Sequence, residues 1–150
     1  MKFVTERVAF SPMPTLEELG ELLKEFRAFV VLVEDFELEY DIEALEEVVD
    51  VLYSLIPDFP APSLEQLLEI VQWIEARVRE GKKVLIHCLS GSGRSGTVAV
   101  AYLMYSQGLS LHDALSKVRS LKPSAIETED QMDVLRAFEV LLAWDRKVFK

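Results

Sequence analysis

Cysteine and arginine side chains lie at a spacing that suits nucleophilic attack on a bound oxyanion. Cys88 and Arg94 belong to the stretch His-Cys-Leu-Ser-Gly-Ser-Gly-Arg-Ser at residues 87–95, between an apolar run and a helical pattern. A thiolate is a strong nucleophile, and a guanidinium can bind two phosphate or carboxylate oxygens at once through its planar fork. The spacing therefore predicts a site at which Cys88 attacks a group that Arg94 holds.

The residues that follow the cysteine predict a phosphate-binding loop. Glycines in this loop let the backbone adopt unusual dihedral angles and approach a ligand closely. Amides in such a turn form an anion nest, and the following helix adds the positive end of its dipole. We expect a phosphate-sized dianion to bind the loop formed by Leu89, Ser90, Gly91, Ser92, Gly93 and Arg94.

The same loop should make the thiol reactive. A helix N-terminus and a nearby cation lower the pKa of a cysteine from about 8.5 to roughly 3.5–7.5, so we expect Cys88 to be a thiolate at neutral pH. Ser95 can donate a hydrogen bond to the sulfur, and His87 can order the loop through its ring nitrogens. A free cysteine is otherwise most often a small buried hydrophobic residue. The accompanying His, Gly and Ser argue against that simpler interpretation.

The glycines of the loop also fit a different pattern. Gly91, Gly93 and Gly96 form G-x-G-x-x-G, which is typical of dinucleotide-binding folds. That fold needs another strand about 20 residues later that ends in an acidic residue. The acid near that distance is Asp113, in the first turn of a capped helix, and no strand pattern follows residue 105. A Walker A loop is excluded as well, because no Lys-Ser or Lys-Thr pair follows the glycines.

The stretch at 87–95 resembles the H-C-x-x-G-x-x-R-S/T signature of protein tyrosine and dual-specificity phosphatases, with Gly91 at the family's central glycine. The resemblance extends to residues 56–70, 81–105 and 127–132, and it points to the minimal protein tyrosine phosphatases of archaea. It implies the cysteine-phosphatase fold and hydrolysis of phosphotyrosine, with phosphoserine and phosphothreonine left open. It also implies that no metal and no cofactor takes part, so that activity survives EDTA.

Hydrolysis of a phosphate ester needs an acid that protonates the leaving oxygen. In the family this acid is an Asp on a mobile loop before the Cys, and Asp58 lies 30 residues before Cys88. We expect the strand before Asp58 to lie beside the strand at 83–87, so that both loops leave the carboxyl ends of neighbouring parallel strands. Asp58 could also be an ordinary turn residue, and Asp35 and Asp41 are alternative acids.

Gln131 has two interpretations that do not exclude each other. By the resemblance, it positions the water that hydrolyses a phosphocysteine intermediate. By its spacing from Thr128, it completes a capping box at the start of the last helix. The implied mechanism has two steps. Cys88 attacks phosphorus while Asp58 protonates the leaving group, and ionised Asp58 then activates the water.

The elements that position these residues alternate between strands and helices up to residue 105 and are helical afterwards. Apolar β-branched runs predict strands at 28–35, 48–56 and 83–87. Helical spacing and capping residues predict helices after Thr15, Ser63 (with Gln66 in a capping box), Ser110 and Thr128, together with helices at 42–48 and 95–106. We therefore predict one α/β domain over residues 1–150. It has a mostly parallel sheet of about four to five strands, helices on both faces and a helical C-terminal third.

The composition restricts the partners. The 150-residue chain has 26 acidic and 16 basic residues and a net charge of −10, which disfavours nucleic acids and anionic membranes as partners. It has no apolar run long enough to span a bilayer and no secretory signal, and its single Cys excludes an internal disulfide. We therefore expect a cytoplasmic monomer that acts on phosphorylated proteins and binds inorganic phosphate or similar oxyanions as product or inhibitor.

Three other functions are compatible with parts of the sequence. A rhodanese-like sulfurtransferase also attacks from a Cys in a loop closed by a basic residue, but it does not need Asp58. A phosphatase of the same fold for a non-protein phosphate, such as a phosphoinositide or an RNA triphosphate, usually has extra lysines in or near the loop, and residues 89–93 contain none. A non-catalytic phosphate-binding module would be expected to lack the Cys, the Arg or the Asp, and all three are present.

Overall fold

A five-stranded sheet forms the centre of the computed structural model, which describes residues 1–57 and 60–148. The strands lie in the order β1-β2-β5-β3-β4, and all neighbours are parallel except β1 and β2. Their bounds are Lys2–Phe3 for β1, Val8–Ser11 for β2, Ala28–Val31 for β3, Asp50–Tyr53 for β4 and Val84–His87 for β5. The mostly parallel α/β sheet that the sequence predicts is therefore confirmed.

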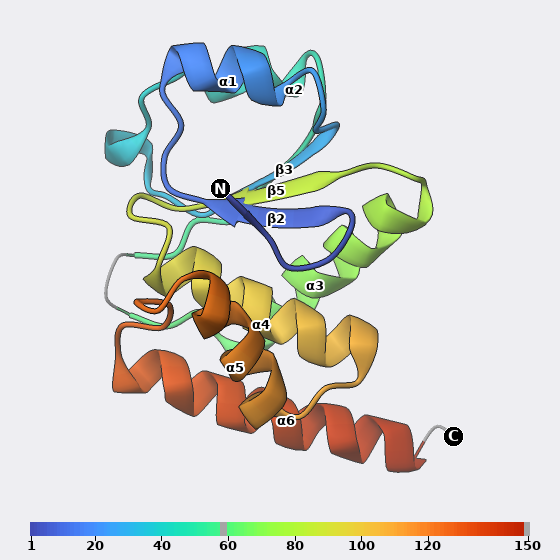
Figure 1. Cartoon of the computed structure of the whole chain (residues 1–150). Helices are drawn as coiled ribbons and strands as arrows, with labels where there is room; N and C mark the ends of the chain where they lie inside the picture. The colour runs from blue at the N-terminus through green and yellow to red at the C-terminus, as the bar shows by residue number, and fades with distance from the viewer. Residues whose placement is uncertain (58–59, 149–150) are drawn as a thin grey trace.

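Helices cover both faces of this sheet (Figure 1). Helices α1 and α2 lie on one face, and helices α3 to α6 lie on the other. Their bounds are Leu16–Leu22 for α1, Ile42–Glu46 for α2, Leu64–Arg79 for α3, Gly93–Gln107 for α4, Leu111–Leu121 for α5 and Glu129–Val148 for α6. A short 3₁₀ helix, η1, covers Asp35–Glu37. The flanking helices and the helical C-terminal third agree with the prediction.

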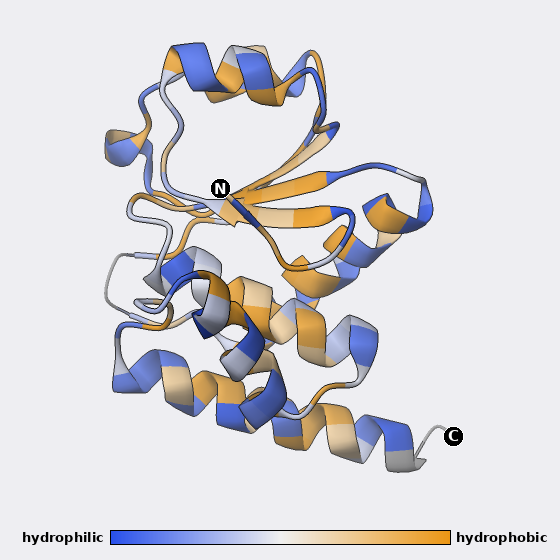
Figure 2. Ribbon diagram, viewed as in Figure 1, coloured by the Kyte–Doolittle hydropathy of each residue, from blue (hydrophilic) through white to orange (hydrophobic). Residues whose placement is uncertain are grey.

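The core lies around the sheet and α4. All residues of β2, β3 and β5 are buried, as expected for strands that are covered on both faces. Residues Gly93 to Met104 of α4 are buried too, because this helix packs against β2, β5, α3, α5 and α6. Figure 2 shows apolar residues along the central strands and along α4. The nearly continuous apolar pattern of this helix therefore reflects its central position.

The carboxyl ends of the parallel strands meet at one edge of the sheet. Ser11 of β2 and Val31 of β3 both lie opposite His87, the last residue of β5. Tyr53, the last residue of β4, lies opposite Val31. The loops that follow these four strands therefore leave from the same edge, where parallel sheets bind their ligands.

The order of the strands corrects one expectation. The strand before Asp58 was expected beside the strand at 83–87, whereas β4 pairs with β3. The two places beside β5 are taken by β3 and β2. No strand was predicted from the N-terminal stretch that forms β2, which pairs with β5 along its whole length. The strands predicted at 28–35 and 48–56 are also shorter, with four residues each.

A predicted capping box at the start of α3 forms only in part. The Ser63 side chain accepts the backbone N–H of Gln66 at 3.0 Å, as expected for an N-cap. The Gln66 side chain does not return to Ser63, because its amide donates to Ser54 Oγ at 2.9 Å and to the Leu55 carbonyl at 3.0 Å. These hydrogen bonds connect the first turn of α3 to the segment that follows β4.

The central position of α4 predicts a large stability effect at Leu103. Its side chain is completely buried, so Leu103→Ala leaves a cavity and should lower the free energy of unfolding by about 2–5 kcal/mol. Leu16→Ala is the matched control, because Leu16 is 69% exposed and its truncation should cost at most about 0.5 kcal/mol. Urea unfolding followed by circular dichroism measures both values. Equal losses in the two variants would contradict the central role of α4.

Candidate active site

The predicted phosphate-binding loop lies between β5 and α4, and we call residues 88–94 the Cys88 loop. The segment that follows β2 supports it from one side. The Cys88 amide donates to the Ser11 carbonyl at 3.4 Å, and the Met13 amide donates to the Leu89 carbonyl at 3.0 Å. The loop is thus held by the backbone of a neighbouring strand end, which the sequence does not indicate.

Gly91 is required by the shape of this loop. Its φ angle is +79°, in the left-handed region that disfavours residues with a side chain. A Cβ atom at this position would lie 2.6 Å from the nitrogen of Pro12. The close approach of Pro12 therefore explains why the centre of the loop is a glycine.

The Cys88 sulfur lies inside the loop, and its side chain is 1% exposed. The Gly91 amide donates to Sγ at 3.2 Å, and Ser95 Oγ lies 3.2 Å from the same atom. Ser95 belongs to the first turn of α4, so the sulfur also lies near the N-terminal end of that helix dipole. The structure thus brings together Cys88, Gly91 and Ser95 as the sequence predicts.

His87 orders the loop through both of its ring nitrogens. Nδ1 lies 3.1 Å from the Cys88 carbonyl, and Nε2 lies 2.7 Å from the hydroxyl of Tyr40. Burial lowers the pKa of His87 to about 4, so the ring is neutral. A carbonyl can only accept, so we assign the proton to Nδ1, and Nε2 accepts the O–H of Tyr40. Sequence reasoning missed Tyr40, whose position in the chain carries no motif.

Arg94 forms a buried ion pair with Glu37 of η1. Nη1 lies 2.8 Å from Oε1 and Nη2 lies 2.9 Å from Oε2, and the two side chains are 2% and 7% exposed. Nη1 also donates to the Ile56 carbonyl at 3.0 Å. The hydrogen bond from Arg94 lowers the pKa of Glu37, so the carboxylate stays ionised. Glu37 was not predicted, because it is one of many acids in its stretch and has no motif spacing.

The segment between α5 and α6 supports the other side of the Cys88 loop. Ser92 Oγ lies 2.9 Å from Ser124 Oγ, and the Ser92 carbonyl accepts the Ile126 amide at 3.3 Å. Ile126 has a φ angle of +67°, which is costly for a β-branched residue. The strained backbone of Ile126 therefore lies directly beside the Cys88 loop, to which its amide is hydrogen-bonded.

Lys122 of the same segment corrects an expectation about charge. Its ammonium group donates to the Ser90 carbonyl at 3.2 Å. The Cys88 loop contains no lysine, but the fold places the Lys122 side chain at the edge of the loop. A second cation is therefore present beside the predicted phosphate site.

Gln131 forms the predicted capping box with Thr128. Its amide N–H donates to Thr128 Oγ1 at 3.1 Å, and its Oε1 atom accepts the Thr128 amide at 3.2 Å. Oε1 also accepts the Glu127 amide at 2.8 Å, and the side chain is almost fully buried. The role of Gln131 in positioning water stays a prediction. In this conformation that role would have to use the Nε2 amide group.

The predicted general acid, Asp58, lies outside the described residues. The two alternative acids have structural contacts: Asp35 accepts the hydroxyl of Tyr53 at 2.8 Å, and Asp41 caps α2 by accepting the Glu43 amide at 3.0 Å. Burial and the contact with Asp35 raise the pKa of Tyr53 to about 12. Both carboxylates are therefore engaged in holding the loops after β3.

Neither a grouped metal site nor a membrane-spanning helix is found among the described residues. Within residues 1–57 and 60–148, no three His, Cys, Asp or Glu side chains are grouped so that they could hold a metal ion. No helix in the described part of the chain has the length and apolar character needed to cross a membrane.

The buried, neutral His87 predicts a pH dependence of stability. The unfolded state takes up a proton near pH 6.5 and the folded state only near pH 4, so stability falls as pH falls through this window. The complete loss should be on the order of 3 kcal/mol. Urea unfolding of wild type and His87→Asn at pH 7 and pH 4.5 measures it, because the other titrating groups are common to both proteins. Identical pH dependences would contradict the neutral ring.

Comparison of sequences identifies a family and several relatives. The sequence pattern described as "Dual specificity phosphatase, catalytic domain" matches residues 56–140. Dual specificity protein phosphatase Mpk3 of Drosophila melanogaster is 44% identical over 71 residues, which are 47% of this chain and 17% of that protein. Cyclin-dependent kinase inhibitor 3 of Sus scrofa is 39% identical over 90 residues, 59% of this chain and 42% of that protein. The chain thus spans less than half the length of these two relatives.

Solved structures resemble the whole described fold. The crystal structure of Tk-PTP in the active form is 61% identical, with a TM-score of 0.90, and the match covers 93% of this chain and 95% of that one. A Gly-to-Ala mutant form of Tk-PTP is 59% identical, with a TM-score of 0.93 over 95% and 96% of the two chains. These likenesses confirm the resemblance to minimal archaeal tyrosine phosphatases. The chain belongs to the dual specificity phosphatase catalytic-domain family, as the signature at residues 87–95 predicts.

Proposed function

We propose that this protein hydrolyses phosphotyrosine in other proteins through a phosphocysteine intermediate. The observation that supports this most directly is the setting of the Cys88 sulfur. It is buried within 3.2 Å of the Gly91 amide and the Ser95 hydroxyl, at the N-terminal end of α4. A nucleophile held inside an anion-binding loop is the arrangement that phosphoryl transfer to sulfur requires.

In the first proposed step, the Cys88 thiolate attacks phosphorus in line with the ester oxygen. The S–P bond forms while the P–O bond to tyrosine breaks, and Asp58 gives its proton to the leaving phenolate. The loop amides and the guanidinium of Arg94 hold the phosphoryl oxygens and stabilise the charge of the transition state.

In the second proposed step, a water molecule hydrolyses the phosphocysteine. Ionised Asp58 takes a proton from the water, the new P–O bond forms and the S–P bond breaks. The products are inorganic phosphate and the regenerated Cys88 thiolate. Ser95 lies where its hydroxyl can donate to the sulfur as it leaves. Gln131 is proposed to aim the water.

Two residues that the sequence did not suggest have positioning roles in this scheme. Glu37 keeps the guanidinium of Arg94 in one orientation through two parallel hydrogen bonds. Tyr40 keeps His87 in one tautomer, and His87 in turn binds the carbonyl of Cys88. Neither residue has to touch the substrate.

The same proposal includes the substrates, the oligomeric state and the cellular compartment. Phosphotyrosine proteins are the proposed substrates, and phosphoserine and phosphothreonine are candidates at the same site. We also propose a cytoplasmic monomer, because the single cysteine fits a reducing compartment and the high net charge favours solubility. Inorganic phosphate and similar oxyanions should bind the Cys88 loop as product or inhibitor.

A second candidate is hydrolysis of a non-protein phosphate by the same residues. Lys122 at the rim of the loop is the observation that favours it, since an added cation can bind a second phosphate. Sulfur transfer has less support, because the family match is to phosphatases. Parallel assays with a phosphotyrosine peptide, a water-soluble phosphoinositide and thiosulfate compare the three functions.

The central prediction concerns Cys88 and Asp58. With EDTA present, wild type should hydrolyse a phosphotyrosine peptide, and Cys88→Ser should be inactive because a serine hydroxyl does not ionise near neutral pH. Asp58→Ala should lose about 10²–10⁴-fold in kcat through the missing proton donor. Asp113→Ala in the first turn of α5 is the matched control and should keep full activity. Loss of wild-type activity on chelation, restored by metal, would contradict this mechanism.

Glu37 gives a prediction that tests the positioning of Arg94. Glu37→Gln removes the charge but keeps the shape, so the guanidinium should lose its fixed orientation and kcat/KM should fall by about 10–100-fold. Glu43→Gln, an equivalent change on exposed α2, should have no effect. Thermal unfolding of both variants shows whether the fold is intact. A folded Glu37→Gln protein with unchanged kcat/KM would remove Glu37 from the scheme.

A further inference from the structure

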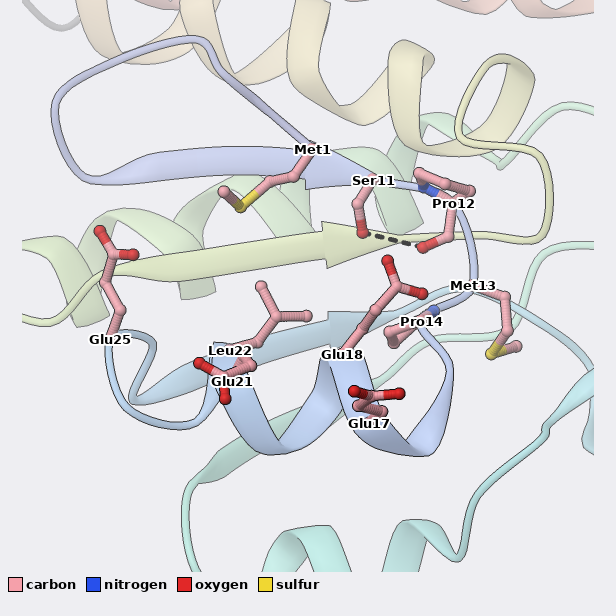
Figure 3. Close-up of a pocket in the computed structure, with 10 residues that line it drawn as sticks. All are labelled: Met1, Ser11, Pro12, Met13, Pro14, Glu17, Glu18, Glu21, Leu22 and Glu25. Atoms are coloured by element: carbon pink, nitrogen blue, oxygen red, sulfur yellow. Dashed lines mark hydrogen bonds between the residues drawn. The ribbon is translucent and has the colours of Figure 1, made fainter.

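An open groove lies beside the Cys88 loop, between α1 and the segment that follows β2 (Figure 3). Its volume is about 560 Å³. The proposed reaction uses none of the side chains that line it. We call it the acidic groove, for the four glutamates that line it: Glu17, Glu18 and Glu21 of α1, and Glu25 of the turn that follows α1.

The acidic groove and the Cys88 loop share one backbone segment. Ser11, Pro12 and Met13 line the groove. The same residues hold the loop, because Ser11 accepts the Cys88 amide and the Met13 amide donates to the Leu89 carbonyl at 3.0 Å. A peptide whose phosphorylated residue lies in the loop can therefore continue into the groove, since each extended residue spans about 3.3 Å.

The α1 wall of the groove is negatively charged. Glu17 and Glu21 lie four residues apart in α1, so they share one side of the helix, and Glu25 follows in the turn after it. Glu18 lies beside them, and hydrogen bonds from Thr15 lower its pKa, so it is ionised. Figure 3 shows Glu18 extending from α1 toward the Ser11–Pro12 backbone.

Lysines compensate only part of this charge. Glu21 pairs with Lys24 at 3.1 Å, and Glu25 pairs with Lys83 at 2.7 Å. Both pairs are exposed at the surface, where such contacts are weak and exchange readily with other cations. Four carboxylates against two lysine ammonium groups and the α-ammonium of Met1, which also lines the groove, leave the groove negative even when both pairs are formed.

Most of the remaining lining is apolar. Pro12, Met13 and Leu22 contribute hydrocarbon surface that is at least partly exposed. Long basic side chains place their methylene stems on such surface while their charged ends reach polar groups. The groove therefore offers both parts of a lysine or arginine side chain a suitable contact.

We propose that the acidic groove binds a basic stretch of the protein substrate next to its phosphorylated residue. This inference rests on the proposed function and adds a substrate class to it. The Cys88 loop binds a dianion and the acidic groove binds cations. Together they favour a phosphorylated residue that has lysine or arginine nearby in the substrate sequence. A second copy of this chain is a poor occupant, because it carries the same net charge of −10.

The test compares phosphotyrosine peptides that differ only in flanking charge. Two arginines are placed within three residues of the phosphotyrosine, on its N-terminal or its C-terminal side, and the reference peptide has alanines there. At low salt, kcat/KM for one arginine peptide should exceed that of the alanine peptide by about 10-fold, and the preference should shrink toward 0.5 M salt. Hydrolysis of p-nitrophenyl phosphate, which is too small to reach the groove, monitors the loop alone.

Two matched double variants test whether the preference for arginine peptides arises in the acidic groove. Glu17→Gln with Glu21→Gln removes two charges from the groove, and Glu43→Gln with Glu46→Gln removes two from exposed α2. The groove variant should lose the arginine preference while its rates with the alanine peptide and p-nitrophenyl phosphate stay unchanged. The α2 variant should keep the preference.

Three results would overturn the inference: no arginine preference in wild type, a preference that survives in the groove variant, or an equal loss in both variants. The last result would assign the preference to overall charge. Failure of the proposed function gives a different result, because wild type would then not hydrolyse p-nitrophenyl phosphate either.

Discussion

The buried ion pair between Arg94 and Glu37 is the interaction on which the arrangement of the site depends. A guanidinium that is 2% exposed needs a compensating charge, and Glu37 supplies it in two parallel hydrogen bonds. The pair joins the N-terminal end of α4 to η1, and the Ile56 carbonyl adds the segment after β4. One side chain thereby holds together loops that leave three different strands.

The remaining contacts extend this arrangement around the Cys88 loop. The segment after β2 binds its backbone, Tyr40 reaches it through His87, and the segment between α5 and α6 binds Ser92. Because these segments leave one edge of the sheet or pack against it, the parallel fold brings residues distant in sequence to the Cys88 loop. Specificity can then arise in neighbouring surfaces, such as the acidic groove, without changes to the loop itself.

Sequence patterns predict what depends on local spacing. The signature at 87–95 predicted the loop, and the strand–loop–helix context predicted its place at the end of β5. Glu37, Tyr40 and Lys122 could not be predicted, because their roles arise from tertiary contacts and not from distances along the chain. The order of β4 and β5 was wrong for a similar reason: β2 has too short a pattern to be recognised, yet it takes one of the two places beside β5. The role of Asp58 rests on spacing alone.

The most direct test of the account is to trap the covalent intermediate. Wild type is mixed with a phosphotyrosine peptide, stopped in acid within milliseconds, digested and examined by mass spectrometry. The account predicts one phosphoryl group per chain on the peptide that contains Cys88, formed as fast as tyrosine is released and lost as phosphate appears. Turnover without phosphorylated Cys88, at times when the scheme requires it to accumulate, would contradict nucleophilic catalysis by this residue.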